Sequence, residues 1–116
     1  QMFPAETAFE MATLGGAKAM GLDDRIGSLE VGKLADCVLH DTDRPEWRPL
    51  LNVVNQLVWA ADGRGVHTVV VDGRVVVEDY RMTGLDESAL WAEAQQRGEA
   101  IAARSGLPDK AKYPVW

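Results

Sequence analysis

Two runs of β-branched residues on either side of Asp72-Gly73 constrain the fold of this chain more than any other feature. Val66–Val71 and Val75–Glu78 have the composition of strands. An Asp-Gly pair readily adopts the positive φ that both central positions of a type I′ turn require. The sequence therefore predicts a hairpin that pairs Val71 with Arg74. Valine lies on both faces of the strands, so we expect both faces to be covered.

Helical periodicity begins near the first residues. Pro4 suits a first helical turn, and an apolar stripe follows it at Ala5, Ala8, Phe9 and Ala12. The pattern predicts a helix over residues 4–14, an interruption at Gly15-Gly16 because glycine is unfavourable inside a helix, and a second short helix over 16–20.

A second helical pattern covers residues 87–104. Asp86 is the expected N-cap, and Gly106 with Pro108 is expected to end the helix. Leu90, Ala94 and Ile101 mark its predicted inner face.

The middle of the chain changes period at Ile26. Residues 35–41 alternate as a strand does, with Cys37 and Leu39 on one face and Val38 and His40 on the other. Residues 42–55 contain two prolines and predict a loop with one helical turn near 50–54. Residues 56–60 predict a short strand.

Composition limits the functions open to this chain. Its 116 residues suffice for one domain and are too few for a (β/α)₈ barrel. The net charge of −6 argues against nucleic acid and anionic membrane as partners. A single cysteine and the lack of a signal-like or membrane-spanning run favour a cytoplasmic protein. The chain opens on Gln1 instead of Met, which suggests a piece of a longer protein.

Few residues could hold a metal ion. The candidates are Cys37, His40 and His67, and neither a His-x-His pair nor a His-Glu-x-x-His motif occurs. Cys37 and His40 are expected on opposite faces of one strand, where they could not easily share an ion. We expect Cys37 to be a small core residue, and each histidine to turn a ring nitrogen to solvent or to a backbone partner.

Other chemistries have equally weak signals. The serines lack a nucleophile elbow, the run Gly63–Gly65 is too short for a phosphate loop, and Asp23-Asp24 predicts a solvated turn. The serines in question are Ser28, Ser88 and Ser105. Around Lys33, in Gly32-Lys33-Leu34-Ala35-Asp36, glycine permits a tight turn and Asp36 can accept hydrogen bonds from nearby amides. We therefore predict no catalytic, cofactor-binding or metal-binding residue in this chain.

Three segments in sequence order resemble one enzyme superfamily. Ala12–Gly21, then Gly27–Asp41, then Val69–Val77 are similar to the C-terminal end of amidohydrolases, within the branch that deaminates or dechlorinates purines, pyrimidines and triazines. The resemblance covers residues 5–105.

The resemblance implies an α+β piece of a larger enzyme. Residues 1–22 would be the last helical segment of a metal-dependent (β/α)₈ barrel, residues 23–84 part of a composite β-sandwich with its hairpin at 66–79, and residues 85–116 a C-terminal helix and tail. Strands from the enzyme's N-terminus would complete the sandwich. Zinc or iron would be held upstream of this chain, and Lys33 would not be the carbamylated lysine that some members carry inside the barrel.

The implied function belongs to the intact enzyme. A metal-bound hydroxide would attack an electron-poor carbon of a nitrogen heterocycle and break a C–N or C–Cl bond. The expected partners are the missing N-terminal part, a small heterocyclic substrate in the parent, and a possible second copy of the chain. Two alternatives stay open: a non-enzymatic scaffold or interaction module, and a dihydroorotase- or imidazolonepropionase-like branch.

Overall fold

A computed structural model describes residues 3–106 of the chain. They form two compact units, one up to Thr83 and one from Gly84. The division predicted near residue 22 stays a prediction. None of the helices within residues 3–106 combines the length and the apolar character needed to cross a membrane.

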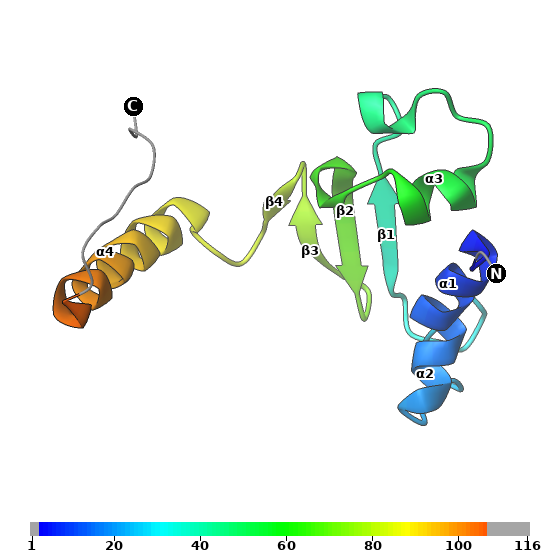
Figure 1. Cartoon of the computed structure of the whole chain (residues 1–116). Helices are drawn as coiled ribbons and strands as arrows, with labels where there is room; N and C mark the ends of the chain where they lie inside the picture. Colours follow the sequence, from blue (N-terminus) through cyan, green and yellow to red (C-terminus); the bar gives the residue numbers. More distant parts are fainter. Residues whose placement is uncertain (1–2, 107–116) are drawn as a thin grey trace. The chain divides into compact units, whose positions relative to one another are not determined.

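The first unit contains a four-stranded antiparallel sheet in which each strand pairs with its neighbours in the chain, in the order β1-β2-β3-β4 (Figure 1). The strands are β1 Cys37–His40, β2 Val66–Val71, β3 Arg74–Glu78 and β4 Arg81–Met82. The sequence predicted the first three, but it did not indicate β4.

The predicted hairpin is confirmed. Val71 pairs with Arg74, and Asp72 and Gly73 both have positive φ, 49° and 74°, as a type I′ turn requires. The expectation that both faces are covered is not met by the described residues. Val71 is 48% exposed and Val75 is 44% exposed, so the sheet presents apolar side chains that nothing in the described chain covers.

The first helix is longer than predicted. α1 (Ala5–Glu10), a π-helical turn (Met11–Gly15) and α2 (Gly16–Ala19) follow one another without a break, so the interruption predicted at Gly15-Gly16 is wrong. The two glycines fit the wider turn instead. A Cβ on Gly15 would lie 3.3 Å from the carbonyl oxygen of Glu10, which is tighter than most side chains tolerate.

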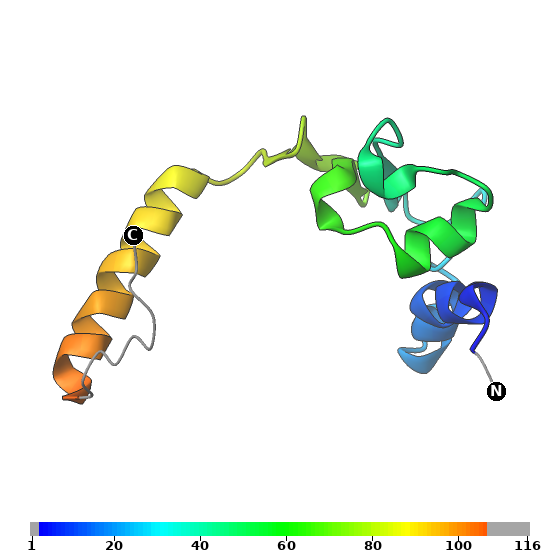
Figure 2. The ribbon, with the colours of Figure 1, turned by 45° about the horizontal axis from the view of Figure 1, so that its top comes forward.

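The strand predicted over residues 56–60 is also wrong, because those residues belong to α3 (Val53–Trp59). The side chain of Asn52 accepts a hydrogen bond from the backbone N–H of Asn55 over 2.9 Å, and this N-cap starts the helix. The preceding loop contains a 3₁₀ turn at Pro45–Trp47 that was not predicted, and the helical turn predicted near 50–54 overlaps the start of α3. Figure 2 shows α1, α2 and α3 on one side of the sheet.

The second unit is the helix α4, Glu87–Ser105. Asp86 is its N-cap as predicted and accepts from the backbone N–H of Ala89 over 3.0 Å, and Gly106 ends it with a left-handed φ of 64°. The inner face predicted at Leu90, Ala94 and Ile101 is not buried, since Leu90 is 46% exposed and Ile101 59%. The expected role of Pro108 lies outside the described residues.

The core of the described chain is small. Among residues 3–106 the fully buried apolar side chains are Ala5, Ala17 and Trp47, whereas domains normally have one contiguous apolar cluster. The chain therefore has secondary structure and strand pairing without the large core that usually accompanies them.

Candidate functional site: an apolar groove

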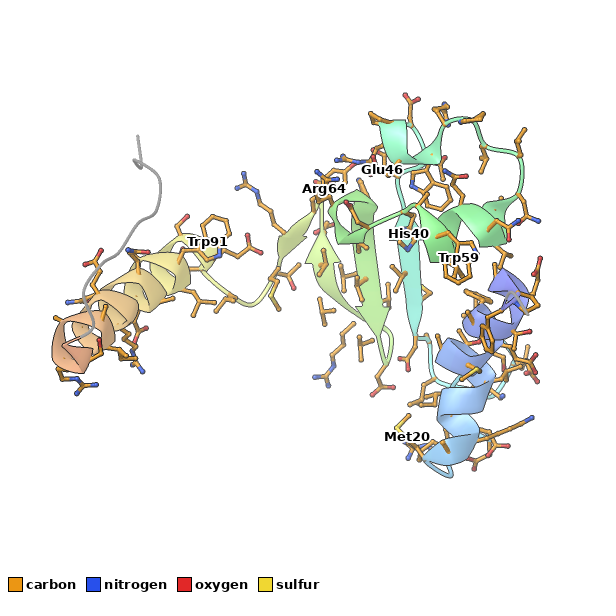
Figure 3. All side chains as sticks on the ribbon, viewed as in Figure 1. Met20, His40, Glu46, Trp59, Arg64 and Trp91 are labelled. Carbon is orange, nitrogen blue, oxygen red and sulfur yellow. The ribbon has the colours of Figure 1, made fainter. Side chains whose placement is uncertain are left out.

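A groove of about 920 Å³ lies between the first helix and the sheet of the first unit. One wall comes from the helix and includes Phe9, Thr13 and Ala17, and the other comes from β1 and β2 and includes Val38 and Val70. Figure 3 labels Met20 and His40, which both contribute to the lining. The walls are mostly hydrocarbon, so the groove is suited to an apolar partner.

A close contact at Gly27 fixes the lower part of this groove. Gly27 has a φ of 94°, and a Cβ placed there would lie 2.8 Å from the Cβ of Ala17. Only glycine permits both the backbone conformation and the approach to the helix. The loop after α2 is therefore held directly against the buried face of that helix.

His40 has a polar atom without a partner in this groove. Its Nδ1 is buried and makes no hydrogen bond to the residues described, and neither does the buried Nε1 of Trp47. The two rings meet edge-on with centroids 5.8 Å apart. We expected one ring nitrogen of each histidine to find solvent or a backbone partner, and the unpartnered Nδ1 of His40 does not decide that for its Nε2.

The predicted metal candidates do not form a metal site. Cys37 and His40 both line the groove, together with Val38 between them, so lining the groove does not decide on which face of the strand each side chain lies. The expectation of opposite faces stays a prediction. His67 contacts Thr68 through Nδ1, at 2.8 Å, and Asp79 through Nε2, at 3.1 Å. Within residues 3–106 no group of three His, Cys, Asp or Glu side chains could hold an ion.

The glycine-lysine turn has a structural role. Lys33 donates to the hydroxyl of Ser28 over 2.7 Å and lies 3.3 Å from the carboxylate of Glu30. The hydrogen bonds from Ser28 and Lys33 hold the pKa of Glu30 below its usual value. Asp36 accepts from the backbone N–H of Asp72 over 2.7 Å, as its motif predicted. Asp23 and Asp24 lie exposed in a turn.

A second polar cluster lies at the opposite end of the sheet from the hairpin turn. Tyr80 donates its hydroxyl to Asp41 over 2.9 Å, and Arg44 pairs with Glu46 over 3.0 Å. Asp62 accepts from the side chain of Arg64 over 2.7 Å, and this bond is the main cause that lowers the pKa of Asp62. The Tyr80–Asp41 bond ties the turn after β3 to the loop after β1. Sequence reasoning did not indicate it, because its partners are up to 39 residues apart.

Residues 1–76 match the model of the amidohydrolase family. The chain belongs to this family. It is 43% identical over 106 residues to a 5-methylthioadenosine/S-adenosylhomocysteine deaminase of Desulfovibrio desulfuricans, an alignment that covers 91% of this chain and 24% of that protein. It is 40% identical to a 5'-deoxyadenosine deaminase of Methanosarcina mazei, over 87% of this chain and 23% of that one.

A solved relative has the same fold. The crystal structure of an adenosine deaminase from Xanthomonas campestris with bound zinc superposes with a TM-score of 0.81 at 41% identity, and the match covers 86% of this chain and 23% of that one. An atrazine chlorohydrolase from Arthrobacter aurescens in complex with zinc matches with a TM-score of 0.71 at 28% identity, over 79% of this chain and 20% of that one. This amidohydrolase chain therefore spans about a quarter of the length of the curated relatives it matches.

Proposed function

We propose that this chain is the structural C-terminal portion of a metal-dependent aminohydrolase whose remaining polypeptide hydrolyses a C–N bond on a purine-like heterocycle. In this proposal the helix from Ala5 to Ala19 is the last barrel helix, and the sheet is part of a composite β-sandwich. The observation that carries the proposal is the apolar groove of about 920 Å³ between them.

The groove needs an occupant. Soluble monomers seldom leave a contiguous apolar patch of more than a few hundred Å² open to water, and the described chain buries few apolar side chains of its own. The relatives are about four times as long as the aligned chain. We infer that the rest of the same polypeptide fills the groove, and that this contact joins the barrel to the sandwich.

Metal chemistry is not assigned to this chain. Zinc is present in the related adenosine deaminase structure, but the described residues contain no side-chain group that fits such an ion. In the proposal, the metal-binding residues and the substrate pocket both belong to the remaining polypeptide. The chain's own contribution is to fold against that part and support it.

Deamination is favoured over dechlorination on the grounds of similarity. The deaminases match at 40–43% identity, whereas the chlorohydrolase matches at 28%. The names of the former point to an adenine nucleoside or a thioether derivative of one as the substrate class. A scaffold without enzymatic activity is the second candidate, and the small core of the isolated chain is compatible with it.

Activity is tested with the complete polypeptide that the gene encodes, loaded with zinc. Ammonia release is measured from adenosine, 5'-deoxyadenosine and 5-methylthioadenosine, and chloride release from atrazine, compounds taken from the names of the relatives. The proposal expects ammonia from at least one nucleoside and no turnover by the 116-residue chain alone. Chloride release without ammonia would move the protein to the dechlorinating branch. Absence of both products would favour the second candidate, a scaffold without enzymatic activity.

Docking is tested separately from activity. Leu29 lines the groove and is 77% exposed, whereas Val31, two residues later, is 109% exposed and does not line it. In the isolated chain, Leu29→Arg should change the free energy of unfolding by no more than about 0.5 kcal/mol, as surface substitutions do. In the complete polypeptide it should cost about 2–4 kcal/mol, because a charge would be buried unpaired. Val31→Arg is the matched control, and an equal cost of Leu29→Arg in both proteins would refute docking at the groove.

A further inference from the structure

The turn between β3 and β4 has an unusual sequence for its conformation. Asp79 and Tyr80 have φ values of 48° and 66°, close to the 49° and 74° of Asp72 and Gly73 in the preceding turn. Glycine adopts positive φ at little cost, whereas a bulky residue there is an outlier. Tyr80 therefore occupies a strained position that Gly73 occupies without strain.

Long-range contacts compensate for this strain. The hydroxyl of Tyr80 donates to Asp41 over 2.9 Å, and its backbone N–H donates to the carbonyl of His67 over 3.1 Å. The ring meets His67 edge-on with centroids 5.0 Å apart, and the guanidinium carbon of Arg44 lies 5.8 Å from its centroid. Contacts from two other segments, the loop after β1 and strand β2, thus converge on one side chain, which glycine could not provide.

Asp79 is held by the same histidine. Nε2 of His67 lies 3.1 Å from its carboxylate, and Nδ1 lies 2.8 Å from the hydroxyl of Thr68. A neutral ring with its proton on Nε2 satisfies both contacts, because Nε2 then donates to Asp79 and Nδ1 accepts from Thr68. The contact therefore does not require a charged histidine.

The turn lies where the first unit ends. β4 has only two residues, and Thr83 follows it with a backbone hydrogen bond to Val76 over 3.1 Å. The second unit begins at the next residue, Gly84. The hydroxyl of Thr83 also donates to the carbonyl of Val75 over 2.9 Å. Because only two residues of β4 pair with β3, the contacts of the preceding turn add to the few that keep it on the sheet.

We propose that Asp79-Tyr80, clamped by Asp41, His67 and Arg44, is a conformational latch that holds β4 on the sheet. With the latch closed, the segment 79–83 is part of the sheet. When the Tyr80–Asp41 bond is lost, the strained turn relaxes and β4 leaves β3, while the pairing of β1, β2 and β3 persists.

The test is residue-resolved amide hydrogen exchange in the complete polypeptide. Tyr80→Phe removes only the hydroxyl and keeps the ring contacts. It should accelerate exchange at the amides of residue 80 and Thr83 roughly three- to tenfold, with no change at Val69 and Val77 in the hairpin. Tyr80→Gly relieves the strain but removes every side-chain contact, and it should accelerate the same two amides.

The controls distinguish a latch from the alternative that the fold accommodates Tyr80 without depending on its contacts. If Tyr80 merely tolerated its position, Tyr80→Gly would slow exchange at Thr83 or leave it unchanged, and that result would overturn the proposal. Asp41→Ala tests the latch with the turn sequence intact, so it decides the matter if Tyr80→Phe fails to fold; unchanged exchange at Thr83 would count against the latch. Asp43→Ala removes a neighbouring carboxylate that pairs with Arg48 over 2.9 Å, and it should leave both amides unchanged.

Discussion

The carboxylate of Asp36 accepts a hydrogen bond from the backbone N–H of Asp72 over 2.7 Å, although 36 residues separate them. The next amide, that of Gly73, donates to the carbonyl of Ala35 over 3.0 Å. These two bonds satisfy consecutive donors at the tip of the hairpin. The segment before β1 thereby fixes the turn between β2 and β3.

Asp36→Ala should destabilise the chain by about 1–2 kcal/mol, because a charge-assisted hydrogen bond to a turn amide is lost. Chemical denaturation measures the change. Asp23→Ala, which removes an exposed carboxylate from a different turn, is the control and should have little effect. Equal stability of both variants would show that the bond to Asp72 contributes nothing.

Gly73→Val should lower the free energy of unfolding by about 1–3 kcal/mol. A Cβ at this position meets nothing within 4 Å, so the cost comes from the positive φ alone and not from crowding. Gly98→Ala is the matched control. It lies inside α4 with similarly open space and should stabilise the helix by about 0.5–1 kcal/mol. A thermal melt in which Gly73→Val matches the parent would argue against the type I′ turn.

Gly27→Ala should lower the free energy of unfolding by about 2–4 kcal/mol, more than a substitution of the same size in an open turn. Alanine at this position would have to adopt the strained φ of 94°, and its methyl group would lie 2.8 Å from the Cβ of Ala17. The measurement is denaturant unfolding, with the double variant Gly27→Ala/Ala17→Gly as its partner. Ala17→Gly removes the clash and should restore part of the loss, whereas no restoration would mean that packing at this point is not tight.

The latch should depend on pH at both extremes. The hydrogen bonds from Asp43 and Tyr80 lower the pKa of Asp41 below its usual 3.8, so its contribution is complete above that value and is lost as pH falls through the lowered pKa. The bond to Asp41 raises the pKa of Tyr80 above 10.0, so the contribution of Tyr80 is complete below that value and is lost as pH rises through the raised pKa.

Exchange at Thr83, corrected for the intrinsic rate, should therefore accelerate as pH falls through the lowered pKa of Asp41 and as pH rises through the raised pKa of Tyr80. Tyr80→Phe should abolish the alkaline limb. If exchange still accelerates at high pH in this variant, the acceleration comes from the titration of another group.

Patterns that are local in sequence predicted their elements well. The hairpin at Asp72-Gly73 and the cap at Asp86 depend on residues within a few positions of each other, and both are confirmed. The strand predicted over residues 56–60 is wrong because Leu57, Val58 and Trp59 have the composition of a strand. The cap at Asn52 and packing against α1 make this segment a helix instead. The short strand β4 was not predicted, because the turn before it has Tyr80 at a position where a hairpin pattern normally has glycine.

The groove and the latch were less accessible to sequence reasoning. The stripe at Ala5, Ala8, Phe9 and Ala12 predicted an apolar helix face that needs a cover, but it did not indicate that β1 and β2 form the other wall. Val38 and His40, which the alternation placed on one face, both line the groove. The partners of Tyr80 come from two distant segments, the loop after β1 and strand β2, which no local pattern connects.

The order β1-β2-β3-β4 has a consequence for how this polypeptide acquires its structure. Each strand pairs with the strand before or after it in the chain, so the sheet needs no contact with distant polypeptide to form its ladders. The β2–β3 and β3–β4 pairs join residues close in sequence, whereas β1 pairs with β2 across the intervening loop and α3, and local contacts favour rapid folding. The sheet can therefore assemble first as a preformed platform, and burial of its apolar face becomes a later, separate step that sets the final stability.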